Sequence, residues 1–197
     1  MESALKYFIK LITLSLLPFL FYGCAEDKPE PNQNKSDSAF EVPQKTMCEL
    51  LPMSKMSSIT GIVFNEEIST VHQTDESMGK YVSQCGYYSP GKNIAVLVRR
   101  FGNTSFPKEK EKIIGGDKTG DAEIDELQEN ALKTCKTVTD LGDAAYFYDL
   151  GGIYNLIVVY KDYYQIHISS YGKDLGFDDN TLNVSKKVVE EVMKIFH

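Results

Sequence analysis

Three strand-like runs, closely spaced in the last third of the chain, constrain the fold more than any other feature. Gly151-Gly152 and Lys161-Asp162 separate the runs 144–150, 153–160 and 163–171, which are rich in β-branched and aromatic residues. Connections of two residues join antiparallel neighbours. We therefore predict a three-stranded meander.

Two-residue connections also fix the register, with Leu150 opposite Ile153 and Tyr160 opposite Tyr163. Because side chains alternate between the faces of a strand, the meander has two distinct faces. The face predicted to be the core carries the residues Tyr146, Tyr148, Leu150, Ile153, Asn155, Ile157, Val159, Tyr164, Ile166 and Ile168.

The second face mixes aromatic and aliphatic groups with polar ends, whereas a solvent face should be largely charged. Its members Tyr154, Tyr160, Tyr163 and His167 suit a ligand or a partner protein. The alternative is that a helix covers this face and makes it a second core layer. The sequence leaves both interpretations open.

A hairpin precedes the meander. The runs 81–88 and 94–101 are strand-like, and Pro90-Gly91 between them is a turn signal. Residues 62–64 predict a short strand, followed by a polar loop that carries His72. We therefore predict an α+β domain with a single antiparallel sheet of about five strands, a hairpin plus a three-stranded meander.

Helices are predicted at the start, middle and end of this domain. Thr46 and Glu49 can form a capping box, and apolar residues at helical spacing follow in residues 52–61. The middle helix spans residues 122–136, and the last helix follows the cap residues 178–180 and runs to Phe196. The charge run 108–112 indicates a solvated helical face.

The N-terminus has the plan of a signal peptide. Lys6 and Lys10 precede an apolar run of about 12 residues, which is shorter than the roughly 20 that a stable membrane-spanning helix needs. Pro18 lies inside the run. We therefore expect residues 1–23 to be removed.

Cys24 follows Gly23, as in bacterial lipoprotein signals that end in a small residue and a cysteine that receives diacylglycerol. Phe21 and Tyr22 depart from the usual pattern of Leu and a small residue. The alternative is an ordinary secretory signal that is cut after Ala25. Lipidation of Cys24 would hold the protein at a membrane of the bacterial cell envelope, on the periplasmic face or on the outer-membrane surface.

Residues 24–43 are polar and rich in Pro and Asn, which predicts a flexible tether whose end docks on the domain through Phe40 and Val42. The remaining residues, 44–197, suit one α+β domain. Without residues 1–23, 19 basic and 27 acidic side chains remain, a net charge near −8. An acidic chain of this kind gives no electrostatic reason to expect nucleic acid as a partner.

Catalytic and metal-binding motifs are missing from the sequence. It contains no HExxH, GxSxG, P-loop or CxxC pattern. Cys135 with His72 or His167 is the one conceivable nucleophile and base. Asp117 begins an EF-hand-like spacing, which fails because Ala122 stands where the loop requires Gly. We therefore expect no cofactor, no metal and no enzymatic activity.

Several short patterns taken together resemble a family of small bacterial lipoproteins built on an exported domain of unknown function. They are Cys48-Glu49-Leu50-Leu51, Thr60-Gly61, Cys85 in a strand, and Leu141-Gly142-Asp143-Ala144-Ala145-Tyr146. The resemblance covers residues 46–171 and assigns no catalytic residue. It implies a disulfide between Cys48 and Cys85, with Cys85 to Cys135 as the competing pair.

The sequence thus predicts a membrane-anchored bacterial lipoprotein whose domain binds a ligand or an envelope protein. Two other classes stay open, a structural or surface-exposed envelope protein and a hydrolase.

Overall fold

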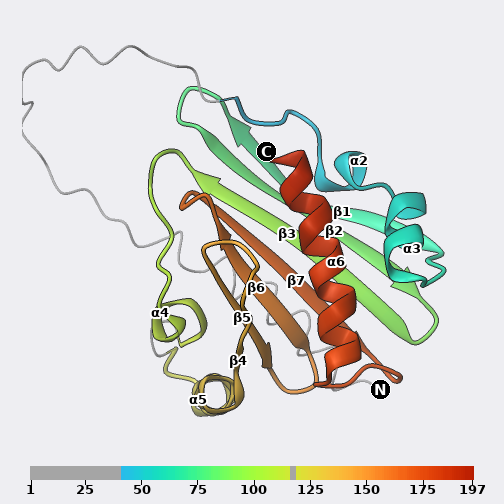
Figure 1. Cartoon of the computed structure of the whole chain (residues 1–197), viewed down its shortest axis with the longest axis vertical. Coiled ribbons are helices and arrows are strands. Elements are labelled where there is room, and N and C mark those ends of the chain that lie inside the picture. The colour runs from blue at the N-terminus through green and yellow to red at the C-terminus, as the bar shows by residue number, and fades with distance from the viewer. Residues whose placement is uncertain (1–40, 116–118) are drawn as a thin grey trace, which may run out of the picture. The chain divides into compact units, whose positions relative to one another are not determined.

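A computed structural model describes residues 41–115 and 119–197 of the chain, which form an antiparallel sheet with helices on both faces (Figure 1). Its seven strands lie in the order β1-β2-β3-β7-β6-β5-β4. The strands are β1 (Glu66–Asp75), β2 (Lys80–Ser89), β3 (Lys92–Phe101), β4 (Lys136–Thr137), β5 (Ala144–Asp149), β6 (Tyr154–Tyr160) and β7 (Tyr164–Gly172).

The α+β class is confirmed, but the prediction of about five strands is wrong. The hairpin and the meander are present as β2–β3 and β5–β7, and β7 pairs with β3 to join them into one sheet. The missed strands are the two edges. β1 occupies most of the predicted polar loop, and β4 is only two residues long.

Five helices are present in the described residues, and the predicted capping box at Thr46 and the predicted cap before the last helix are both found. Thr46 and Glu49 form the capping box of α2 (Met47–Leu50), and Gly61 ends α3 (Met53–Thr60) in the left-handed conformation. The charge run contributes to α4 (Lys110–Ile114). Asp121 caps α5 (Ala122–Thr134), and Asp178 caps α6 (Asp179–Ile195).

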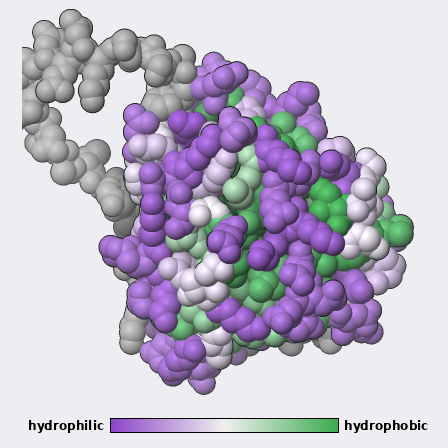
Figure 2. Space-filling model, viewed as in Figure 1, coloured by the Kyte–Doolittle hydropathy of each residue, from purple (hydrophilic) through white to green (hydrophobic). Residues whose placement is uncertain are grey.

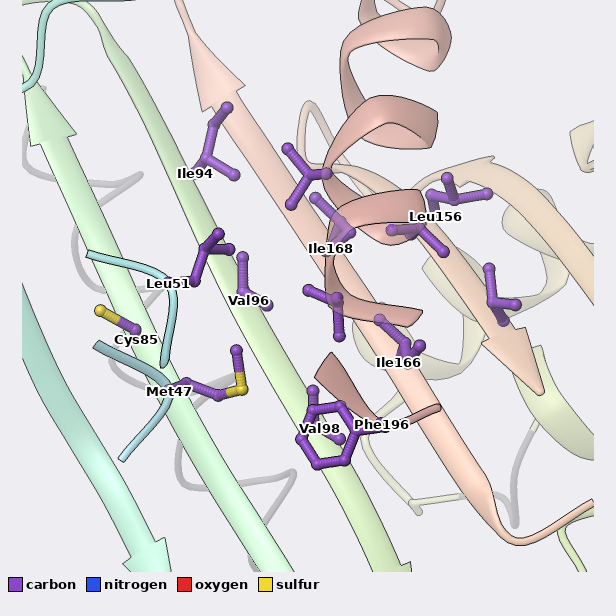
Figure 3. Close-up of a cluster of buried hydrophobic side chains, with 14 of the residues drawn as sticks. Met47, Leu51, Cys85, Ile94, Val96, Val98, Leu156, Ile166, Ile168 and Phe196 are labelled. Atoms are coloured by element: carbon purple, nitrogen blue, oxygen red, sulfur yellow. The ribbon is translucent and has the colours of Figure 1, made fainter. Parts of the chain in front are cut away.

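The main core lies between one face of the sheet and helices α2, α3 and α6. We call this the α6 face. Met47 of α2 and Leu51, the residue after α2, pack into this core, and Phe196, the residue after α6, lies in it beside Val98 (Figure 3). Val42 also belongs to this core, as the sequence led us to expect, whereas Phe40 lies outside the described residues.

The opposite face, which we call the reverse face, carries a smaller cluster. Ile114 from α4 and Ala131 from α5 pack there against Tyr148 and Ile157 of β5 and β6. Helices α4 and α5 cover only β5 and β6 on this face. Among residues 41–115 and 119–197, no helix covers the part of the reverse face that β1, β2, β3 and β7 form.

The predicted register between β6 and β7 is wrong by one residue. Tyr160 pairs with Tyr164, so the connection holds three residues, and Lys161 and Asp162 both adopt positive φ. A shift of one residue moves every side chain of β7 to the other face. Ile166 and Ile168 therefore join the core of the α6 face with Leu156 and Val158, instead of lying with Ile157 and Val159.

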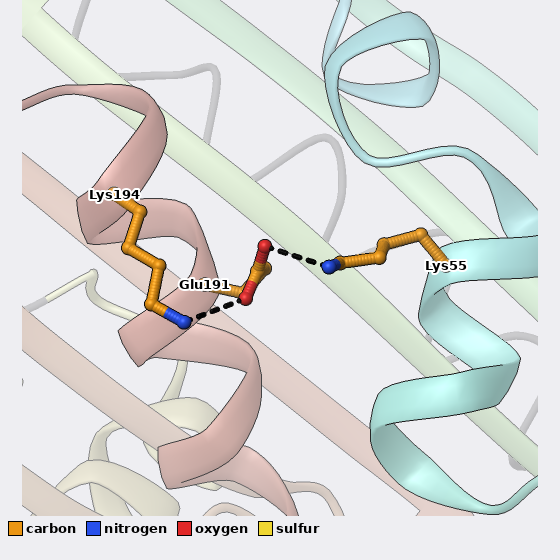
Figure 4. Close-up of polar contacts among 3 residues, drawn as sticks. All are labelled: Lys55, Glu191 and Lys194. Carbon is orange, nitrogen blue, oxygen red and sulfur yellow. Dashed lines mark hydrogen bonds and ion pairs between the residues drawn. The ribbon is translucent and has the colours of Figure 1, made fainter.

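The outer surface of the α6 side is mostly hydrophilic, with hydrophobic groups visible between the polar ones (Figure 2). Helices α3 and α6 are joined across this side by one ion pair, between Lys55 and Glu191. Glu191 of α6 lies 3.0 Å from the Nζ atoms of both Lys55 and Lys194 (Figure 4). No helix in the described part of the chain is long and apolar enough to cross a membrane.

Candidate functional site: a polar cluster on the reverse face

The four residues proposed for binding from the sequence do not form one surface. Tyr154 and Tyr160 lie on the α6 face, packed against the main core, and the Tyr160 hydroxyl lies 3.3 Å from Nδ1 of His197. Tyr163 lies in the connection between β6 and β7, and His167 points to the reverse face. Tyr154 and Tyr160 therefore lie in a core layer that a helix covers, which was the alternative to a binding face.

His167 belongs instead to a hydrogen-bonded group on the reverse face. Its Nε2 lies 2.9 Å from Oδ1 of Asn155, and the Ser169 hydroxyl donates to the same oxygen at 2.8 Å. The Asn155 amide donates to the Ile153 carbonyl, which fixes its orientation. Because Oδ1 can only accept, His167 must carry its proton on Nε2.

Arg99 of β3 lies beside this group. It stands opposite Val82 of β2 and Gln165 of β7, and its own strand neighbour Leu97 stands opposite His167. The Nε atom of Arg99 is buried and has no hydrogen-bond partner among the described residues. We call Arg99, Tyr148, Asn155, Gln165, His167 and Ser169 the Arg99 cluster.

Burial dominates the electrostatics of this cluster. It lowers the pKa of Arg99 below its ordinary value, and the nearby Tyr148 phenol opposes this only weakly. Burial, and after it the charge of Arg99, lowers the pKa of His167 to about 3. At neutral pH the cluster therefore has one positive charge, on Arg99, and a neutral imidazole beside it.

An aromatic edge and small residues adjoin the cluster. Gly86, Ala95 and Ser169 stand opposite one another on β2, β3 and β7. The ring of Tyr88 lies over Gly86, so that a Cβ there would approach the Tyr88 hydroxyl oxygen to 2.7 Å. The reverse face thus places one row of small residues beside the donors of the Arg99 cluster.

The predicted disulfide is confirmed. Cys48 of α2 and Cys85 of β2 are bonded, with their Cα atoms 5.2 Å apart. The competing pair of Cys85 with Cys135 is therefore excluded, and Cys135 is a partly buried free thiol. The bond ties α2 to the centre of the β1–β3 half of the sheet.

One of the two pairs considered from the sequence as nucleophile and base, Cys135 with His72, is separated in space. His72 lies on β1, at one edge of the sheet, and Cys135 precedes β4 at the other edge. His72 instead contacts the Ser83 hydroxyl and the Gln44 carbonyl, at 3.3 Å and 3.1 Å, and so holds the incoming chain on the sheet.

The aspartates of the EF-hand-like spacing have local structural roles where they are described. Asp121 caps α5, and the Asp125 carboxylate accepts hydrogen bonds from the backbone N–H and the hydroxyl of Thr119. Asp117 lies outside the described residues. Within residues 41–115 and 119–197, no group of three His, Cys, Asp or Glu side chains is arranged to hold a metal ion.

Sequence reasoning missed Arg99, Gln165 and the role of Asn155. No local signal marked Arg99, because β3 carries polar residues at both ends and its buried alternation at Ile94, Val96 and Val98 falls on the opposite face. The correct β6–β7 register would have placed Asn155, Gln165, His167 and Ser169 on one face. Cys24, the proposed lipidation site, lies outside the described residues.

Comparisons of the chain with protein-family models, with curated proteins and with solved structures found no match.

Proposed function

We propose that the chain is a lipid-anchored, exported bacterial protein whose domain binds a ligand or partner in the cell envelope through the reverse face of its sheet. The observation that carries the export step is the Cys48–Cys85 disulfide. Structural disulfides persist in oxidising compartments such as the periplasm and are rare in the cytosol. An apolar segment ahead of Cys24 supplies the matching signal.

Anchoring through Cys24 is consistent with where the domain begins. Val42 is buried in the core, and the His72 contact to the Gln44 carbonyl fixes the chain just after it. The segment 25–41 then separates the lipid from the folded domain.

The binding role is assigned to the reverse face because the other face is filled. Helices α2, α3 and α6 cover the α6 face and bury its apolar side chains. On the reverse face, the described helices cover β5 and β6, and the Arg99 cluster lies next to the uncovered strands. Side chains that are polar, partly buried and grouped in this way are typical of binding surfaces.

The anchor is tested by expressing the full chain in a bacterial host that is fed a labelled fatty acid. We expect the wild type to carry label, to gain the mass of the acyl chains and to partition into detergent. Cys24→Ala should lose all three properties, whereas Cys135→Ala, which removes an unrelated thiol, should keep them. A soluble, unlabelled wild type that begins at Glu26 would contradict the anchor.

A further inference from the structure

Arg99 is a partly buried cation with no counter-charge among the residues that the structure describes. Its Nε atom has no hydrogen-bond partner within residues 41–115 and 119–197, and the nearby Tyr148 phenol is uncharged at neutral pH because burial raises its pKa. Its neighbours in register, Val82 and Gln165, carry no charge. A buried cation left in this state is costly, and an anion beside it removes much of that cost.

The adjacent residue Arg100 differs from Arg99, because its side chain packs within the domain and has a partner there. On the α6 face its guanidinium donates to the Tyr164 hydroxyl at 2.7 Å and lies 5.0 Å from the centre of that ring. Arg99 has no equivalent contact among the described residues. The difference between the two neighbours points to a role for Arg99 outside the packing of the domain.

Donors that surround Arg99 suit an anion. The Gln165 side chain stands directly opposite it, is 7% exposed and makes no side-chain hydrogen bond in the described part of the chain. Burial raises the pKa of Tyr148, so its hydroxyl keeps its proton at neutral pH and can donate. His167 is neutral and directs its Nε2 proton to Asn155, so it does not repel Arg99. A guanidinium binds carboxylate and phosphate groups through two parallel hydrogen bonds.

We propose that the Arg99 cluster binds the anionic group, a carboxylate or a phosphate, of a small-molecule ligand on the reverse face. The overall charge of the chain is −7, so an anion is not drawn to the surface in general and needs this local site. The inference rests on the binding role proposed for the reverse face, and it does not depend on the lipid anchor.

Two-dimensional NMR of the purified full-length protein in mild detergent tests the site. Sodium phosphate and sodium succinate are the probes, and sodium chloride at matched ionic strength is the reference. We expect one of the two probes to move the Nε–H signal of Arg99 and the side-chain amide of Gln165 in a saturable way. The probe that binds distinguishes a phosphate ligand from a carboxylate ligand.

Two variants separate the site from general electrostatics. Arg99→Gln should weaken the saturable change at least about tenfold. Lys80 of β2 stands opposite Phe101, which follows Arg99 on the same face of β3. Lys80→Gln therefore removes a nearby cation and should leave binding unchanged. The proposal is overturned if neither probe exceeds chloride, or if both variants lose binding equally. Because the wild-type Arg99 signal is read directly, the test holds even if Arg99→Gln does not fold, and failure here leaves the Cys24 labelling result untouched.

Discussion

Arg99 and Arg100 are adjacent on β3, yet they face opposite sides of the sheet and have opposite surroundings. Arg100 is bonded to Tyr164, while Arg99 is desolvated without an anion among the described residues. Replacing a buried, unpaired charge with an apolar side chain of similar length often stabilises a fold. We therefore expect Arg99→Met to raise the free energy of unfolding by about 1–2 kcal/mol.

Arg100→Met is the matched control for this prediction. It removes the hydrogen bonds to the Tyr164 hydroxyl and the Gly102 carbonyl and a cation–π contact, so it should lower the free energy of unfolding by about 1–2 kcal/mol. Urea denaturation followed by circular dichroism measures both changes. If Arg99→Met were the more destabilising of the two, Arg99 would have a structural partner, and the unpaired-cation interpretation would be wrong.

His167 should make stability depend on pH. Its pKa is about 3 in the fold and about 6.5 in the unfolded chain, so the unfolded state binds the proton first as the pH falls. Stability therefore rises with pH between about 3 and 6.5, and this contribution reaches a slope of about 1.4 kcal/mol per pH unit. Above this window His167 is neutral in both states and contributes no pH dependence.

The variant His167→Gln isolates this effect, because carboxylates also titrate in the same range. We expect the wild type to lose stability faster than His167→Gln between pH 6 and pH 4, as measured by urea denaturation at each pH. NMR should show the His167 ring neutral at pH 5, with its proton on Nε2. Parallel stability curves for the two proteins, or a charged His167 at pH 5, would refute the assignment.

Among the helices and strands, the sequence predicted those that hydrophobic periodicity and capping residues mark. The hairpin, the three strands of the meander, the end of the helix predicted in residues 52–61 and the start of the last helix after Asp178 were found from such signals. Strand β1 was missed because it is an edge strand, exposed along its first half, and so shows no apolar alternation. Its pairing with β2, rather than its own composition, makes it a strand.

The register error has a different origin. Lys161 and Asp162 both adopt positive φ, as in a two-residue turn, but Tyr163 belongs to the connection as well. Asp162 is further held by its N–H bond to Asp143 and by its carbonyl, which accepts from the Phe106 N–H. Asp143 and Phe106 are distant in sequence from this connection. Rules for local turns therefore could not show that the connection includes Tyr163 and is three residues long.

Helix α6 should be held by its apolar stripe far more than by its ion pairs. Val192 is fully buried, whereas the adjacent Glu191 pairs with Lys55 and Lys194 at the surface. We expect Val192→Ala to cost roughly 1–3 kcal/mol of unfolding free energy and Glu191→Ala less than about 1 kcal/mol. Thermal and urea denaturation give both values. A larger cost for Glu191→Ala would show that the ion pairs dominate the docking of α6.

For the whole molecule, the candidate site illustrates the limit of reading one segment at a time. The Arg99 cluster draws residues from β3, β5, β6 and β7, and it forms only because β7 lies between β3 and β6. The sequence predicts each strand locally, but nothing in it states that the hairpin and the meander share an edge. The site could therefore be found only after the two halves of the sheet were joined.

The disulfide provides the whole-molecule prediction. It connects residues that are 37 positions apart, and the closed loop contains α3 and β1. On the chain-entropy account, a loop of this length contributes roughly 3–4 kcal/mol by restricting the unfolded chain. We therefore expect the double variant Cys48→Ala/Cys85→Ala to lose about that much unfolding free energy, and Cys135→Ala, which breaks no bond, to lose less than about 1 kcal/mol.

A reducing agent gives an independent reading of the same contribution, because it acts on the bond without changing any side-chain volume elsewhere. It should destabilise the wild type and Cys135→Ala to a similar extent and leave the double variant unchanged. Since β1 is the edge strand inside the loop and pairs only with β2 among the described strands, its amide hydrogens should show the largest gain in exchange rate on reduction. Equal acceleration in β1 and in the central strands β3 and β7 would instead show that the bond stabilises the sheet as one cooperative unit.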